Sequence, residues 1–347
     1  MSRREGFLDV GVGETRAVIT LDGRPERLIV ERDGDLPCQR LGAHVAARLR
    51  KVDRALGLAF LDLGAGPDAV LNLRPEFGRL VEGQALAVEI RGEPRGDKGA
   101  AVRVIGETDG APRVLEPGPG LAETLAAFSL AGPVTTGAAA RDAADEAEAE
   151  ALETVFALPG GGTVAIERTR ALIAVDVDVG ERAGTESKRA ARAGNLAALA
   201  TAARVLRLKG EGGLVVIDLA GRGHDGPALI AAARAAFAPD NPGIALGPIS
   251  RFGTLELTAP RRRRGVLDRL LGADGRLTVE SVALRLLRAL ERAALADPGG
   301  RIAAVAAPDV AAAASPGLTA LAARFGARLR LEADAGRARE SFEVSGS

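Results

Sequence analysis

The sequence predicts a multidomain protein of the α/β class with α+β character, and three observations lead to this assignment. Two short runs rich in β-branched residues, 171–178 and 214–218, end in Asp and flank one helix-length segment. This pattern is typical of neighbouring strands that are joined by a crossover helix and covered on both faces. Strand-like pieces separated by turn residues fill 37–103, the spacing of a small β-barrel. Helix-like and strand-like segments alternate over 277–347, as in a small α/β domain.

The composition limits which cores and surfaces the chain can form. The chain has 347 residues, of which 47% are hydrophobic but only 3% aromatic, so its cores are expected to consist of Ala, Leu and Val. Lys+Arg and Asp+Glu both number 46, so a nucleic-acid surface would require local clustering of basic residues. The single cysteine, Cys38, excludes an internal disulfide and a multi-cysteine zinc site. No apolar run suits a signal peptide or a membrane span, so we expect a cytoplasmic protein without a membrane segment.

The first third of the chain reads as β-structure. Segments 16–21 and 27–31 flank Asp22-Gly23, a strong signal for a tight hairpin. Within the predicted barrel, Phe60 allows two interpretations. It is either a stacking platform for single-stranded nucleic acid, as small barrels often carry, or a core residue of a barrel with few aromatic side chains. The sequence leaves both open.

Residues 106–152 carry no strong signal for a domain of their own. Prolines interrupt the first part. The run of Ala, Glu and Asp over 137–153 predicts a solvated acidic helix or a linker. The glycine cluster 160–162 that follows predicts a hairpin turn rather than a phosphate cradle.

Asp176 and Asp218 end the two central strands, where open α/β sheets place their ligands. Two carboxylates brought together repel each other unless a cation lies between them. Hard oxygen ligands suit Mg²⁺ or Mn²⁺. A divalent cation bound next to a phosphodiester is what a metal-dependent nuclease uses for hydrolysis. The alternative is that the two residues only cap unrelated loops.

The segment 184–209 is the predicted crossover helix, with an apolar face of Leu and Ala. Basic residues lie near both of its ends. Beside paired carboxylates such side chains would hold RNA phosphates, whereas on an ordinary helix they only face solvent. The residues are Lys188, Arg189 and Arg192 at the start and Arg204, Arg207 and Lys209 at the end.

Beyond Asp218 the sequence predicts a loop with His224, a helix over 225–237 and a strand over 254–258. Arg251, just before this strand, is a candidate phosphate contact, and Phe252 is expected to pack inside. The run of four arginines at 261–264 reads either as a solvated linker or as a basic segment that follows RNA. The expected C-terminal elements are helices over 279–296 and 308–325 and strands over 301–306, 328–332 and 340–344.

Four motifs occur in order, namely 171–178, Asn195-Leu196, 204–218 and 249–256. Together they resemble the core of the ribonuclease E/G family of bacterial endoribonucleases. The resemblance implies five parts along the chain. These are an RNase H-like N-terminal sheet (1–36), an inserted OB-fold RNA-binding barrel (37–105), a shortened remnant of the family's 5′-sensor region or linker (106–152), a DNase I-like catalytic part (153–265) and a small C-terminal domain (266–347).

The resemblance also implies roles for single residues. Asp176 and Asp218 would hold the catalytic Mg²⁺, or Mn²⁺, with Asp178 as a further metal ligand and Asn195 in the catalytic group. Phe60, Arg95 and Lys98 match positions on the RNA-binding face of the family's barrel. With the basic residues named above, the predicted RNA contacts are Phe60, Arg95, Lys98, Arg204, Arg207, Lys209 and Arg251.

The chain also departs from the family. Asp178 stands where the family usually has Asn, Val70 replaces a second stacking aromatic, and Gly221 replaces an acidic residue. The long 5′-sensor region and the cysteines of a zinc link are missing, so we expect no zinc.

The resemblance thus predicts a Mg²⁺-dependent endoribonuclease that cleaves single-stranded RNA to 5′-phosphate and 3′-hydroxyl ends, with a homodimer implied by resemblance only. The alternatives are a non-catalytic RNA-binding relative, motivated by the departures, and a metal-dependent DNase or phosphoesterase.

Overall fold

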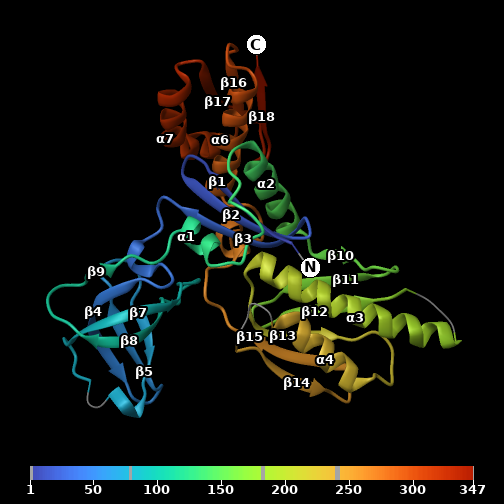
Figure 1. The fold of residues 1–347 in the computed structure, drawn as a ribbon. Coiled ribbons are helices and arrows are strands. Elements are labelled where there is room, and N and C mark those ends of the chain that lie inside the picture. Colours follow the sequence, from blue (N-terminus) through green and yellow to red (C-terminus); the bar gives the residue numbers. More distant parts are fainter. Residues whose placement is uncertain (1–2, 78–79, 181–183, 239–242, 347) are drawn as a thin grey trace.

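The computed structural model describes residues 3–77, 80–180, 184–238 and 243–346. It contains helices and several sheets, which confirms the α/β class (Figure 1). A three-stranded N-terminal sheet lies at the centre, with the barrel and a six-stranded sheet below it and the C-terminal elements above. No described helix is long and apolar enough to cross a membrane.

The N-terminal sheet is an antiparallel meander of β1 (Arg4–Val10), β2 (Glu14–Leu21) and β3 (Arg24–Arg32). Asp22 and Gly23 join β2 to β3 with φ angles of 51° and 80°. Positive φ at both central residues is the type I′ geometry that matches the twist of a hairpin. The hairpin predicted at this position is therefore confirmed.

A closed barrel follows. It is formed by β4 (His44–Asp53), β5 (Leu58–Asp62), β6 (Ala69–Asn72), β7 (Ala85–Gly92) and β8 (Ala101–Glu107) in the order β4-β5-β6-β8-β7, and β7 returns to β4. The β6–β8 pair is parallel. β9 (Arg113–Glu116) adds to β4, and the short 3₁₀ helices η1 (Pro37–Gln39) and η2 (Pro75–Phe77) lie in connecting loops. The small barrel is thus confirmed, although its strands continue beyond the predicted end.

After α1 (Leu121–Ala126), the acidic run forms α2 (Ala138–Leu152). The prediction of a helix was right, but the expectation that it is solvated was wrong. Its stripe of Ala140, Ala144, Ala147 and Ala151 is completely buried, and Glu148 is only 3% exposed. Small side chains at helical spacing let α2 pack closely on the N-terminal sheet, and distant arginines neutralise its buried carboxylate.

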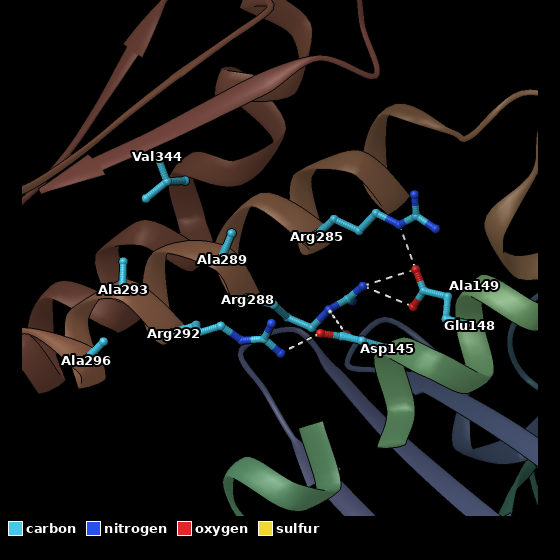
Figure 2. Close-up of a pocket in the computed structure, with 10 residues that line it drawn as sticks. All are labelled: Asp145, Glu148, Ala149, Arg285, Arg288, Ala289, Arg292, Ala293, Ala296 and Val344. Atoms are coloured by element: carbon cyan, nitrogen blue, oxygen red, sulfur yellow. Dashed lines mark hydrogen bonds and ion pairs between the residues drawn. The ribbon is translucent and has the colours of Figure 1, made fainter. Parts of the chain in front are cut away.

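Figure 2 shows two of these arginines, Arg285 and Arg288, directed at the Glu148 carboxylate. Arg16 of β2 lies 3.0 Å from the Glu148 carboxylate, and Arg285 and Arg288 of α6 (Val279–Ala296) lie 2.6 Å and 3.0 Å from it. Burial alone would raise the pKa of Glu148, but the three guanidinium groups hold that pKa below its ordinary value. A pocket of about 510 Å³ lies beside this network, between α2 and α6. The ion pairs join the two ends of the chain.

The six-stranded sheet has the order β10-β11-β12-β13-β15-β14, and only its β12–β13 pair is parallel. Its strands are β10 (Val155–Ala157), β11 (Thr163–Arg168), β12 (Ile173–Asp178), β13 (Gly213–Asp218), β14 (Ala245–Ile249) and β15 (Thr254–Ala259).

Two helices, α3 (Gly184–Lys209) and α4 (Gly226–Phe237), share one core with this sheet. The buried side chains of β12 and β13 alternate with exposed ones, so the helices cover one face only. The expectation of strands covered on both faces was wrong. The opposite face is open because hairpins, rather than further crossover helices, connect most of the strands.

The C-terminal elements are α5 (Val266–Leu270), α6 (Val279–Ala296), β16 (Ile302–Ala306), α7 (Pro308–Phe325), β17 (Leu329–Ala333) and β18 (Phe342–Gly346), with sheet order β17-β16-β18. The predicted helices and strands are confirmed to within two residues. Their core continues into α2 and the N-terminal sheet, through Val18, Leu28 and Val30. The two ends of the chain therefore form one packed body.

Candidate functional site

The two strand-end carboxylates lie side by side. In the parallel β12–β13 pair, Asp176 is the direct register partner of Asp218. Both side chains are exposed on the open face of the sheet, because Val175 and Ile217 before them point into the core. Adjacent strands are about 4.8 Å apart, so side chains at paired positions can reach one cation. The predicted adjacency of the two strands is confirmed.

The described part of the chain contains no group of three or more His, Cys, Asp or Glu side chains arranged to hold a metal ion. Asp178 lies two residues beyond Asp176 on the same face, and its carboxylate accepts a hydrogen bond of 2.8 Å from the Gly180 amide. A cation at Asp176 and Asp218 would therefore take most of its ligands from water and phosphate. Magnesium usually binds in this way, with one or two carboxylates.

Asn195 lies on α3 behind the strand ends and is only 1% exposed. Its side-chain amide donates to the Ala220 carbonyl (3.0 Å), and its side-chain oxygen accepts from the Ala220 amide (2.9 Å). Both polar groups of Asn195 are thus used to hold the backbone two residues after Asp218. In this structure Asn195 positions the loop rather than facing the open edge.

The loop after Asp218 and the turn before β15 lie together at this edge. The Leu219 amide donates to the Gly253 carbonyl at 3.3 Å, which ties the end of β13 to the turn. A pocket of about 700 Å³ opens between the loop around Gly221–His224 and the turn, and a second pocket of about 270 Å³ lies between the same loop and α3. Both pockets adjoin the end of β13.

Basic side chains line these pockets. Arg222 and Arg251 border the larger one, and Lys188 borders the smaller one. Within the described ranges neither Arg222 nor Arg251 has an acidic partner, so both are available to an anion. Arg251 had been selected from the sequence, whereas Arg222 had not. The alternation of Gly and charged residues over 221–225 was the signal that could have identified it.

The three basic residues at the end of α3 are used inside the protein. Arg204 is 7% exposed, donates to the Pro25 carbonyl (2.8 Å) and pairs with Glu150. Arg207 pairs with Glu26 at 3.0 Å. Lys209 is 2% exposed and donates to the Glu153 carbonyl, and burial lowers its pKa. The prediction that these three residues contact RNA was wrong, because α2 and the N-terminal sheet cover this end of the helix.

Most of the arginine run at 261–264 also has internal partners. Arg261 donates to the Gly212 carbonyl, and Arg263 donates to Thr124 at 2.9 Å. The Arg262 carbonyl accepts a hydrogen bond from the Glu93 amide of the barrel, at 2.8 Å. The run is therefore neither a free linker nor a wholly exposed basic track, and it fastens the barrel to the six-stranded sheet.

In the barrel, Phe60 lies on the outer surface. Its neighbours Ala59 and Leu61 are completely buried, whereas Phe60 is half-buried and lies outside the barrel core. Its cross-strand partners are Lys51 and Val70. Lys98 is exposed and Arg95 half-buried in a tight turn closed by two backbone hydrogen bonds of 3.0 Å. Phe60 is therefore not a residue of the barrel core, and its role as a stacking platform stays a prediction.

Together, a carboxylate pair at a strand-end edge, basic loops around it and a β-barrel in the same chain define a protein suited to phosphate-containing polymers. Residues 139–264 match the model of the Ribonuclease E/G family. This segment contains the six-stranded sheet, both carboxylates and the basic loops.

Curated relatives agree with this match. Ribonuclease E of Haemophilus influenzae and that of Escherichia coli are each 34% identical to the chain over 148 residues, which is 40% of this chain and 16% and 14% of the relatives. Ribonuclease E of Buchnera aphidicola is 31% identical over 165 residues, 44% of this chain and 18% of that relative. Residues 139–264 are therefore similar to the ribonuclease E/G family, and the match spans less than a fifth of these relatives.

Proposed function

We propose that this protein is a divalent-metal-dependent endoribonuclease that cleaves single-stranded RNA. The observation that carries the proposal is the direct pairing of Asp176 with Asp218 on the open face of the sheet, inside the segment that matches the family. The match to this family supports an endoribonuclease role, and the exposed carboxylate pair supplies oxygen ligands of the kind that Mg²⁺ or Mn²⁺ requires.

Each group at the edge has a distinct task. Asp176 and Asp218 would hold the cation, which when bound polarises the scissile phosphate and makes an attacking water more acidic. Arg222 and Arg251 would offset the charge of a phosphate next to the cut. Asn195 keeps the loop after Asp218 in place through its two hydrogen bonds to Ala220. Hydrolysis would leave a 5′-phosphate and a 3′-hydroxyl.

The rest of the chain would guide the substrate. The five-stranded barrel supports an OB-fold RNA-binding module, with the outward Phe60 as a stacking platform and Arg95 and Lys98 as phosphate contacts. We further assign the N-terminal sheet to an RNase H-like unit and the six-stranded sheet to a DNase I-like unit. A homodimer and the cytoplasmic location stay predictions.

The test is cleavage of an end-labelled, AU-rich single-stranded RNA in the presence of Mg²⁺ or Mn²⁺. Asp176→Asn and Asp218→Asn are each expected to abolish cleavage while RNA binding persists. Glu167→Gln, an exposed acid on the same face of the neighbouring strand β11, is the control and should cleave normally. Normal cleavage by both Asp variants would show that the site lies elsewhere.

Asp178→Asn separates the two roles open to this residue. If its carboxylate only caps the turn through Gly180, the variant keeps the hydrogen bond and should need the same Mg²⁺ concentration for half-maximal activity. A clear rise in that concentration would make Asp178 a metal ligand.

The alternative is a non-catalytic RNA-binding relative, and its motivation is the set of departures from the family at Val70, Asp178 and Gly221. Binding of RNA without cleavage under any divalent metal would support it. Cleavage of the matching DNA at the same rate would instead indicate a general nuclease.

A further inference from the structure

Phe252 is unusual in this chain. The protein has nine Phe and no Trp or Tyr, and Phe252 is 76% exposed, more than any other large hydrophobic residue in the described ranges. The sequence had suggested that it packs inside, and the structure contradicts this. Single exposed apolar side chains are common on proteins, so the informative features of Phe252 are the turn that holds it and the groups beside it.

The turn that presents Phe252 is well ordered by hydrogen bonds. The Ser250 and Thr254 hydroxyls form a hydrogen bond of 2.8 Å. The Ser250 hydroxyl oxygen also accepts hydrogen bonds from the backbone amides of Phe252 and Thr254, both at 3.2 Å. Gly253 has φ of +90°, a conformation that favours glycine. The turn therefore projects Arg251 and Phe252 in a fixed direction, with the Arg251 guanidinium 4.6 Å from the Phe252 ring centre.

The ring also lies beside the candidate catalytic edge. Thr254, two residues after Phe252, is the register partner of Asp218, and the Leu219 amide bonds to the Gly253 carbonyl. Phe252, Arg251 and Arg222 all line the pocket of about 700 Å³ at this edge. An aromatic face and two cations around one open pocket match the two parts of a nucleotide, its base and its phosphate.

We infer that this pocket is a nucleotide subsite in which Phe252 stacks on a base of the RNA strand next to the cut, while Arg251 and Arg222 hold the adjoining phosphate. The inference rests on the proposed nuclease function and names the substrate contact of the same site. The subsite is separate from Phe60 on the barrel, so one RNA strand would be stacked at two distant points. Because every base has a π-face, stacking here fixes the position of the strand with little sequence preference.

The binding experiment uses the Asp176→Asn protein, so that no cleavage occurs, and single-stranded RNAs with one 2-aminopurine moved along the strand. Stacking on Phe252 should quench the fluorescence of 2-aminopurine when this base occupies one particular position in the RNA. Phe252→Leu, which keeps an apolar side chain but removes the π-face, should abolish the quenching at that position, and Phe252→Tyr should restore it. Phe60→Leu is the matched control and should change quenching only at a different position.

The kinetic experiment uses proteins with both Asp residues intact and RNAs in which one nucleotide is abasic. Phe252→Leu should lower kcat/KM on intact RNA by about fivefold or more. On the RNA that is abasic at the subsite position, Phe252→Leu and the wild type should cleave equally, because the contact is already lost. Equal loss on every RNA would indicate a structural role of Phe252 and overturn the inference.

The two proposals fail differently. If the wild type cleaves and Phe252→Leu changes neither quenching nor kcat/KM, the subsite is wrong and the nuclease stands. If the wild type never cleaves but Phe252 quenches one 2-aminopurine, the subsite stands as an RNA-binding site and the nuclease is wrong.

Discussion

At the scale of single residues, Glu148 combines deep burial with ion pairs to three arginines. Arg16, Arg285 and Arg288 pair with its carboxylate, and Arg16 also pairs with Asp9 at 2.6 Å. Removing one member of a buried ion network leaves uncompensated charge, which costs about 3–5 kcal/mol. We therefore expect Glu148→Gln to lower the free energy of unfolding by about that amount at neutral pH, as measured by urea denaturation.

The same residue predicts a pH dependence. The pKa of Glu148 lies below its ordinary value of 4.5, so on acidification the unfolded chain takes up this proton first. The stabilisation is complete above about pH 4.5 and is lost as the pH falls through the lower pKa of the folded state. The difference in unfolding free energy between the wild type and Glu148→Gln should thus shrink below pH 4.5. Glu146→Gln, an exposed neighbour on α2, is the control and should parallel the wild type at every pH.

Asn195 gives a second prediction at this scale. Asn195→Ala removes both hydrogen bonds to Ala220 in a fully buried position, so the protein without RNA or metal should lose about 1–3 kcal/mol of stability. Cleavage should fall because the loop after Asp218 loses its anchor. Unchanged stability with lost cleavage would instead place Asn195 directly in the chemistry.

Some residue positions could be predicted from the sequence and others could not. Asp176 and Asp218 follow from local patterns, because one crossover between two parallel strands brings their ends together. The burial of Arg204 could not be read locally, since its partners Pro25 and Glu150 lie far away in the sequence. Long-range packing, which a basic helix end does not reveal, decided the role of this residue.

At the scale of elements, some basic residues stabilise the fold and others are proposed to bind RNA, and substitutions can distinguish the two groups. Arg204→Gln breaks a buried pair and should reduce stability by about 3 kcal/mol or more while leaving RNA affinity unchanged. Lys98→Gln, on an exposed turn of the barrel, should do the opposite. Urea denaturation and anisotropy of a labelled RNA on the same two variants test this. A weaker RNA affinity of a folded Arg204→Gln protein would restore the original prediction for that residue.

The elements themselves were largely predictable, and the two errors have physical causes. The residues of Ile173–Asp178 alternate between apolar and polar, as in a strand covered on one face, but the high apolar content of the run also resembles that of a strand covered on both faces. The acidic composition of α2 suggested solvent exposure because its counter-charges lie on β2 and α6, at opposite ends of the chain. Neither partner is visible in the helix sequence alone.

At the scale of the whole molecule, the equal numbers of acidic and basic residues constrain how RNA is bound. With 46 of each, no long-range field attracts the polymer, and affinity must come from a few local contacts. Several arginines are moreover consumed by internal ion pairs. Among the basic residues, the proposed RNA contacts are Arg95 and Lys98 on the barrel turn and Arg222 and Arg251 around the strand-end pockets.

This distribution of charges predicts that RNA affinity depends only weakly on salt concentration and that the contributions of single residues to this dependence add up. For single strands, log affinity falls with log salt by about 0.7 for each phosphate neutralised. Lys98→Gln and Arg251→Gln should each reduce that slope by about 0.7, and the double variant by about twice as much, because the two residues lie on separate units. Arg301→Gln makes the same change in net charge on an exposed residue of the C-terminal domain and is the control. Anisotropy titrations between about 50 and 200 mM salt measure the slopes. If Arg301→Gln reduces the slope as much as the other two variants, RNA affinity depends on the net charge alone. The proposed path of the RNA from the barrel to the ends of β12 and β13 would then be wrong.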